Sequence, residues 1–227
     1  MKGRRTQNAT RNAAVSRIAV ITGAAAGIGR ATLQAFAAAG WEAIGLDRQP
    51  AGDLPEGARV EQVDVSAPEQ VEAYFAALWV SHQQLHALVN NAAVRLDKPL
   101  VEITPEEWEA VQATNLRSFY LASRSAFPLL KAAKGAIVNV SSSRAISTSI
   151  NEAAYAASKG GMLALTRAMA LEFGTDGVRV NAVLGREGRP QEIARAIQFL
   201  ADEQQASFIT GQALVVDGGA TARLITE

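Results

Sequence analysis

Tyr155 and Lys159 stand four residues apart in a stretch with helical spacing, so both side chains project from one face of the expected helix. A phenol and an ammonium group on one face can form a proton-transfer centre. A free phenol titrates near pH 10, but a cation about 4 Å away at an effective dielectric constant of 20 is worth roughly 4 kcal/mol, or about three pK units. The spacing therefore predicts that Lys159 brings the pKa of Tyr155 toward neutrality, where general acid–base catalysis is most effective.

A run of three serines, Ser141-Ser142-Ser143, is expected to lie close to Tyr155 and Lys159. The run ends a β-branched stretch, and the expected helix with Tyr155 follows it along the chain. In open α/β sheets, ligands bind at the carboxyl ends of the strands. A tyrosine and a lysine at this spacing are common on solvated helices, but a hydroxyl group at such a strand end favours the catalytic interpretation.

A glycine-rich turn provides a second chemical feature. The first apolar run leads directly into Thr22-Gly23-Ala24-Ala25-Ala26-Gly27-Ile28-Gly29, and an amphipathic stretch follows. The glycines permit a tight turn and a close approach of the backbone to a pyrophosphate, whose charge suits the N–H groups and dipole of a helix N-terminus. The structural alternative is that the glycines only close a tight turn between strand and helix.

Asp47 makes the dinucleotide interpretation more specific, because it ends the second apolar run about 20 residues after the turn. A carboxylate there can accept hydrogen bonds from the adenosine ribose hydroxyls, and it would repel a 2′-phosphate. NAD is therefore favoured over NADP. The neighbouring Arg48 keeps NADP open, since a guanidinium group could pair with that phosphate.

Alternating strand and helix patterns must position these residues. Strands are expected at residues 18–22, 42–47, 59–63, 85–90, 136–141, 178–183 and 213–216, and helices near 28–39, 68–80, 105–130, 153–173 and 190–201. Near-continuous apolar strands are buried on both faces, and strand–helix alternation implies right-handed crossovers around a parallel sheet. We expect an α/β fold with a doubly wound parallel sheet, the Rossmann fold, with about seven strands in a single domain.

Composition narrows the class of protein further. The chain has 227 residues, 48% of them apolar, and 22 basic residues balance 22 acidic ones. This length and apolar content favour one large domain, and the absence of net charge argues against a nucleic-acid partner. The sequence holds no cysteine and only two histidines, so no metal site is expected.

The N-terminal residues and the lengths of the apolar runs lead to two further predictions. Residues 1–16 contain several basic side chains and no acidic one, so we interpret them as a flexible basic tail before a domain of residues 17–227. A targeting peptide or a contact with a polyanion is the alternative. No apolar run approaches the roughly 18 residues that span a bilayer, so no membrane partner and a cytoplasmic location are expected.

With these motifs in order, the chain resembles the short-chain dehydrogenases/reductases, in the subgroup of compact single-domain members. The resemblance runs from about Arg17 to Gly219. It rests on the turn Thr22-Gly23-x-x-x-Gly27-Ile28-Gly29, on Asp64-Val65 beside the adenine, on Asn90-Asn91-Ala92-Ala93 with alanine where glycine is usual, and on Asn181-Ala182-Val183, Gly188-Arg189-Pro190 and Gly211-Gln212 through Val216-Asp217-Gly218-Gly219.

The resemblance implies an NAD(P)-dependent alcohol dehydrogenase or ketoreductase that moves a hydride between nicotinamide and a secondary alcohol or ketone. Tyr155 would be the general acid and base. Ser142 would hold the substrate oxygen, with Ser141 and Ser143 as alternatives. Lys159 would bond the nicotinamide ribose and lower the pKa of Tyr155, and Asn115 would position a water that links Lys159 to solvent. The implied cofactor-binding residues are Gly23, Gly27, Ile28, Gly29, Asp47, Asp64, Val65, Asn91, Tyr155 and Lys159.

The resemblance also implies a homo-oligomer, a dimer or a tetramer, formed through the helices near 105–130 and 153–173 and the segment after Gly211.

Two further side chains, Arg95 and Arg144, each follow a cofactor or catalytic motif. Each could face the substrate pocket, where an anionic substrate would need a positively charged group. The alternative is that each forms an ion pair or is exposed to solvent.

One segment departs from the family pattern. After Asn181-Ala182-Val183 the family normally continues with Pro-Gly, a threonine at the nicotinamide carboxamide and a long lid over the substrate, whereas here Leu184-Gly185-Arg186-Glu187 leads straight into Gly188-Arg189-Pro190. Either the chain lacks the lid or the sequence omits it, and the intact flanking motifs favour omission. A chain without a lid would exclude water poorly. A catalytically weak dinucleotide-binding or scaffolding protein is therefore the alternative function.

Overall fold

The computed structural model describes residues 17–185 and 188–222, which contain one seven-stranded sheet in the order β3-β2-β1-β4-β5-β6-β7. Every pairing in it is parallel. The strands are β1 (Ile18–Thr22), β2 (Glu42–Asp47), β3 (Ala58–Gln62), β4 (Ala87–Asn90), β5 (Ala136–Ser142), β6 (Arg179–Gly185) and β7 (Ala213–Val216). The doubly wound α/β fold predicted from the sequence is confirmed, with strand ends shifted by one or two residues in β3, β4, β5 and β6.

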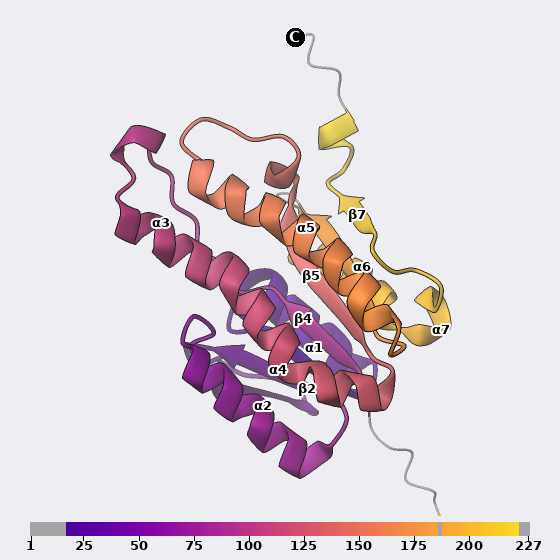
Figure 1. Cartoon of the computed structure of the whole chain (residues 1–227). Helices are drawn as coiled ribbons and strands as arrows, with labels where there is room; N and C mark the ends of the chain where they lie inside the picture. Colours follow the sequence, from indigo (N-terminus) through magenta and orange to yellow (C-terminus); the bar gives the residue numbers. More distant parts are fainter. Residues whose placement is uncertain (1–16, 186–187, 223–227) are drawn as a thin grey trace, which may run out of the picture.

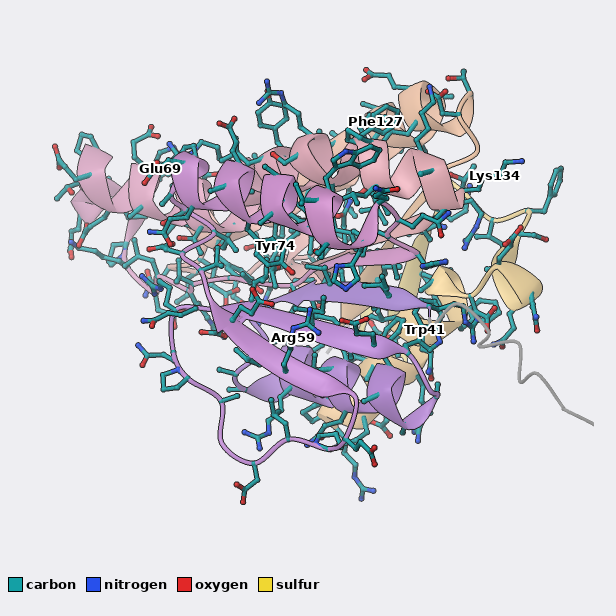
Figure 2. The ribbon with its side chains drawn as sticks, turned by 90° about the horizontal axis from the view of Figure 1, so that it is seen from below. Trp41, Arg59, Glu69, Tyr74, Phe127 and Lys134 are labelled. Carbon is teal, nitrogen blue, oxygen red and sulfur yellow. The ribbon has the colours of Figure 1, made fainter. Side chains whose placement is uncertain are left out.

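Helices cover both faces of the sheet (Figure 1). They are α1 (Gly27–Ala38), α2 (Pro68–His82), α3 (Pro105–Gln112), α4 (Ser118–Ala133), α5 (Ala153–Gly174), α6 (Pro190–Ala201) and the short α7 (Glu203–Ala206). The core between α2, α4, α5 and the sheet is separate from the core beneath α1 and α6. Figure 2 shows the first of these layers from below, with Tyr74 of α2 directed at the strands.

The central strands are buried on both faces, as parallel sheets between two helical layers require. Val20 and Leu88 contact the layer of α2, α4 and α5, whereas Ala19 and Ile21 contact the layer of α1 and α6. Strand β7 differs, because its residues 213–215 are exposed. Its apolar sequence predicted the strand correctly but not this exposure.

Buried amide side chains fix the helices of the site against the sheet. Asn90 and Asn139 are paired neighbours in β4 and β5, and Asn90 Nδ2 donates a hydrogen bond to Asn139 Oδ1 at 2.9 Å. Asn90 Nδ2 also donates to Ser123 of α4, and Asn139 Nδ2 donates to Thr166 of α5. Because unpaired polar groups are costly in a core, these bonds define where α4 and α5 lie along the strands.

The single helix expected near residues 105–130 is wrong in one respect. Helix α3 begins with a capping box between Thr104 and Glu107, but it ends at Gln112 and gives way to a π-helical turn, Ala113–Arg117, before α4. A π turn widens the helix by one residue, and such turns are frequent at functional sites. Here the widened turn contains Asn115.

Several sequence-based expectations stay predictions. The basic tail of residues 1–16 lies outside the described residues, as do residues 223–227 of the expected domain and Arg186 and Glu187 at the position of the family's lid. No helix in the described ranges is long and apolar enough to cross a membrane.

Candidate active site

A cleft of about 560 Å³ lies at the carboxyl ends of the parallel strands. It joins the glycine-rich turn to three of the expected catalytic residues, Ser142, Tyr155 and Lys159. Its lining consists of Gly23, Ala26, Gly27, Ile28, Asp47, Asn91, Ala92, Ala93, Arg95, Val140, Ser141, Ser142, Ser143, Arg144, Tyr155, Lys159, Gly185 and Gly188. Gly185 is level with Ser142 in the pairing of β5 with β6, so the cleft floor there has no bulky side chain.

The glycine-rich turn between β1 and α1 has the geometry of a phosphate-binding loop. Gly23 and Gly27 have φ angles of +66° and +55°, which favour glycine. A Cβ atom on Gly29 would lie 2.0 Å from the carbonyl oxygen of Gly23, so only glycine allows the turn to pack on the helix. The N-cap residue of α1, Ala26, has no side-chain cap. The first N–H groups of α1 are therefore open to an anion from the cleft.

Thr22 and Asn91 hold this turn against β4. The Thr22 hydroxyl accepts hydrogen bonds from the backbone N–H groups of Asn91 (2.9 Å) and Ala92 (3.0 Å). Asn91 Nδ2 in turn donates to the carbonyl oxygens of Thr22 and Gly23. Thr22 belongs to the predicted turn motif, but the sequence analysis does not assign this role to its hydroxyl. Its position at the strand end before the first glycine was the available signal.

Two carboxylates mark the other end of the cleft. Asp47 accepts hydrogen bonds from the backbone N–H groups of Ala25 and Gln49, both at 2.9 Å, so it fixes the glycine-rich turn as well as facing the cleft. Asp64 and Val65 line an adjoining pocket of about 110 Å³ that also contains Asp47. Burial raises the pKa of Asp64, but hydrogen bonds from Ser66 and the charge of Arg48 outweigh it and lower that pKa below its usual value.

Tyr155 and Ser142 meet at the opposite end. Helix α5 presents Tyr155, and β5 presents Ser142, whose hydroxyl accepts a bond from the Arg144 N–H at 3.2 Å. Burial raises the pKa of the Tyr155 phenol above its ordinary value. A hydrogen bond with Ser142, and then the charges of Arg95 and Arg144, lower that pKa without offsetting burial. The prediction that Lys159 brings the pKa of Tyr155 toward neutrality is therefore wrong.

Lys159 is buried and points its ammonium group back to the sheet. Its Nζ donates a hydrogen bond to the carbonyl oxygen of Val140 at 2.7 Å and lies 5.6 Å from the centre of the Tyr155 ring. Burial lowers the pKa of Lys159 to about 7. The physical reason for the wrong expectation is that desolvation acts on both groups, while the lysine charge is directed at a backbone carbonyl.

Asn115 holds the loop that follows β4. Its Oδ1 accepts a bond from the Val94 N–H at 2.7 Å, while its Nδ2 donates to the Val94 carbonyl at 2.8 Å and to Ser158 at 3.1 Å. The side chain is completely buried. Asn115 therefore joins the π-helical turn, the loop after β4 and helix α5, and it does not line the cleft.

Sequence reasoning missed Glu152, which lies at the start of α5. Its side chain is 2% exposed and forms ion pairs with Arg95 and, at 2.7 Å, with Arg144. Sequence analysis predicts either an ion pair or a position in the substrate pocket for Arg95 and Arg144. Both arginines form ion pairs, and both also line the cleft. The available signal was an acidic residue three positions before Tyr155.

The comparisons with known proteins identify the family. The model of the short chain dehydrogenases matches residues 17–185, most of the chain. This chain belongs to the short-chain dehydrogenase/reductase family. A second model, for enoyl-(acyl carrier protein) reductases, matches residues 182–221. The resemblance inferred from the sequence motifs is confirmed.

Curated relatives of this short-chain dehydrogenase/reductase include the meso-2,3-butanediol dehydrogenase of Serratia marcescens, 33% identical over 91% of this chain and 95% of the relative. The 3-oxoacyl-[acyl-carrier-protein] reductase FabG of Chlamydia muridarum is 34% identical over 90% of this chain and 97% of the relative. Both alignments, of 241 and 242 residues, are longer than this chain of 227. These relatives therefore contain residues without a counterpart here.

Two solved structures share the fold. The ligand-free aldohexose dehydrogenase AldT of Thermoplasma acidophilum has a TM-score of 0.88 at 30% identity, covering 93% of this chain and 96% of its own. The 3-ketoacyl-(acyl-carrier-protein) reductase of Brucella melitensis, complexed with NADH, has a TM-score of 0.84 at 30% identity, covering 91% of this chain and 99% of its own.

The residues of this short-chain dehydrogenase/reductase fit a nicotinamide dinucleotide, the type of cofactor that its family binds. The glycine-rich turn leaves the N-terminus of α1 without a side-chain cap, and the cleft extends from there past Asp47 in one direction and to Tyr155 in the other. An anion at the helix and a ribose at the carboxylate would use both features.

Proposed function

We propose that this chain is an NAD-dependent oxidoreductase that interconverts a secondary alcohol and a ketone, with Tyr155 as the general acid and base. The observation that carries the proposal is that one cleft contains both the uncapped N-terminus of α1 and the pair of Tyr155 and Ser142. A chain that only bound a dinucleotide would not need a phenol and a serine hydroxyl together at the far end of the binding site.

The cleft residues divide the binding of the cofactor between them. The turn with Gly23, Gly27, Ile28 and Gly29 would hold the pyrophosphate, and Asp47 the adenosine ribose. Asp64 and Val65 would border the adenine, while Asn91, Tyr155 and Lys159 would border the nicotinamide half. When bound, the cofactor supplies the centre that gives or accepts the hydride.

Tyr155 and Ser142 would act on the substrate oxygen. Burial raises the pKa of Tyr155, so the phenol keeps its proton at neutral pH and can donate it to a ketone oxygen. The Ser142 hydroxyl, which lines the same cleft as Tyr155, would donate to the same oxygen and stabilise the charge that develops there. In the reverse direction the phenol would have to lose its proton first, so we expect alkaline pH to favour alcohol oxidation.

NAD is proposed over NADP because of the geometry around Asp47. Its carboxylate lines the cleft, fixed by two backbone N–H groups, where it would repel a 2′-phosphate. Arg48 is the side chain that could pair with a 2′-phosphate, but its Nη1 lies 3.9 Å from Asp64 Oδ2 and so already faces a carboxylate. The NADH complex of the Brucella melitensis reductase supports this choice.

The test is reduction of a panel of ketones, followed by the absorbance of NADH or NADPH. We expect turnover with NADH, and Tyr155→Phe should lower it by about 100- to 10,000-fold, the range of general acid–base catalysis. Tyr120→Phe, at a half-exposed tyrosine of α4, is the matched control. Cofactor affinity by calorimetry should be unchanged in Tyr120→Phe and should fall by much less than turnover in Tyr155→Phe. Full activity of Tyr155→Phe would refute the mechanism.

A second candidate is a catalytically weak dinucleotide-binding or scaffolding protein. The observation that favours it is that the relatives contain residues without a counterpart in this chain. Calorimetry would then detect NAD binding while no ketone or alcohol of the panel is turned over. Turnover at ordinary enzymatic rates would exclude this candidate.

A further inference from the structure

A buried carboxylate and two arginines form one wall of the cleft. Glu152, the N-cap residue of α5, lies one helical turn before Tyr155. Arg95 Nη2, from the loop after β4, donates a hydrogen bond to Glu152 Oε1, and Arg144 Nε, from the segment after β5, lies 2.7 Å from Oε2. The loop after β4 is thus joined to the connection between β5 and α5 beside Tyr155.

The charges of this cluster do not balance inside the cleft. One buried carboxylate faces two guanidinium groups, although a single arginine can neutralise and hydrogen-bond one carboxylate in a bidentate pair. Arg95 also bonds Asp97 at 2.8 Å, but these two side chains are 51% and 57% exposed, so water screens this pair more than it screens the pair of Arg144 with the buried Glu152. Arg144 has Glu152 as its only acidic partner within residues 17–185 and 188–222.

Arg144 is also placed for contact with a substrate. Its side chain is 32% exposed and lines the cleft, and Nε is the atom that its ion pair uses. The two terminal Nη groups have no hydrogen-bond partner in the described part of the chain. The backbone N–H of the same residue donates to Ser142, so the side chain starts two residues from the serine of the reacting site.

Building on the proposed function, we propose that Arg144 and Arg95, held by Glu152, bind a carboxylate of the substrate, which is therefore an oxo acid or the corresponding hydroxy acid. The planar Nη groups of Arg144 match a carboxylate in a bidentate pair. The cluster holds one positive charge more than Glu152 neutralises, which suits a monoanion better than a phosphate dianion. The keto oxygen of the same molecule would meet Tyr155 and Ser142.

The first experiment compares matched pairs of substrates with and without the charge. We expect the wild type to reduce acetoacetate and pyruvate with a higher kcat/KM than their methyl esters. Arg144→Gln should lower kcat/KM for the acids by about 10- to 100-fold, the value of a hydrogen bond to a charged group, and leave the esters within about threefold. Arg95→Gln should shift the preference in the same direction.

Arg124→Gln is the matched control, because Arg124 also pairs with one glutamate, Glu72, but lies between α2 and α4 away from the cleft. It should leave both substrate classes unchanged. If the wild type uses the esters as well as the acids, or if Arg144→Gln lowers both equally, the carboxylate subsite is refuted while the oxidoreductase proposal stands.

A second experiment does not depend on turnover. Binding of the unreactive monocarboxylate butyrate is measured by saturation-transfer NMR, with methyl phosphate as the competing probe. We expect butyrate to bind about tenfold more weakly to Arg144→Gln than to wild type or Arg124→Gln. This result supports the subsite even if no ketone is turned over and the proposed function fails. No butyrate binding, or tighter binding of methyl phosphate, would overturn the inference.

Discussion

Ser142 differs from its two neighbours in what its side chain contacts. The Ser141 hydroxyl donates a hydrogen bond to the backbone carbonyl of Lys159 at 3.1 Å, which ties β5 to α5. The Ser142 hydroxyl instead accepts a bond from the Arg144 N–H and lines the cleft with Tyr155, whereas Ser143 begins the next turn with its carbonyl accepting bonds from later residues. Adjacent residues in a strand point to opposite sides, so one serine serves the fold and the next serves the site.

Substitution of each serine by alanine separates these roles. We expect Ser142→Ala to lower kcat by about 100- to 1000-fold, as for loss of an oxyanion-stabilising donor, with cofactor affinity unchanged. Ser141→Ala should instead lower the free energy of unfolding by about 1 kcal/mol through its lost hydrogen bond. Steady-state kinetics and urea unfolding measure the two effects. A larger kinetic loss in Ser143→Ala would assign the catalytic role to that residue.

The buried ammonium of Lys159 makes stability depend on pH. Its pKa falls from an ordinary value of 10.5 to about 7 on burial. Between these values the unfolded chain binds a proton that the folded chain does not, so the free energy of unfolding rises with pH. Below about pH 7 both states bind the proton, and the cost of the buried charge is then complete.

Lys159→Met removes this titration. As pH rises from about 7 to about 10, we expect wild type to gain stability relative to Lys159→Met by up to about 1.4 kcal/mol per pH unit. Urea unfolding of both proteins across that range measures the difference. Lys131→Met, at an exposed lysine, should show no such trend. A constant difference between wild type and Lys159→Met would contradict the lowered pKa.

Among the elements, the turn from β1 into α1 tolerates the least change. A Cβ atom on Gly29 would meet the Gly23 carbonyl oxygen at 2.0 Å and Asn91 Nδ2 at 2.7 Å, so backbone would have to move. We expect Gly29→Ala to cost about 1–3 kcal/mol of stability and to weaken cofactor binding, measured by unfolding and calorimetry. Gly174→Ala, where a Cβ meets no atom within 4 Å, should stay within about 1 kcal/mol of wild type.

The sequence predicted the strands and helices whose boundaries depend mainly on residues close together in the chain. The strand boundaries around Thr22 and Asp47 and the helix with Tyr155 follow from apolar periodicity and from glycine and proline positions. The π-helical turn at Asn115 could not be predicted, because its side chain bonds the backbone of Val94, far away in sequence. The Glu152 cluster likewise depends on the loop after β4 meeting the connection between β5 and α5, and the pKa of Tyr155 depends on how deeply the fold buries its phenol.

At the scale of the whole molecule, exposed apolar side chains occur at several places, and two of these are surfaces on segments of the predicted oligomer. One is β7 with the preceding segment, where Phe208 is fully exposed and Leu214 is 37% exposed. The other lies over α4 and α5, where Tyr120 and Leu171 are exposed beside a groove of about 370 Å³ lined by Phe127 and other apolar residues. A parallel strand is ordinarily covered on both faces, so β7 is the unusual feature.

Contact with further copies of the chain would bury the apolar side chains of both surfaces. The predicted dimer or tetramer uses these same segments. Burial of apolar area gains about 25 cal/mol per Å², so a single charge at the centre of either surface should weaken association. We expect light scattering at micromolar concentration to give the mass of a dimer or tetramer. Leu214→Lys or Leu171→Glu should each reduce that mass, while Val80→Glu, at an exposed residue of α2, should not. A monomeric wild type would contradict the prediction, and the exposed face of β7 would then need another partner.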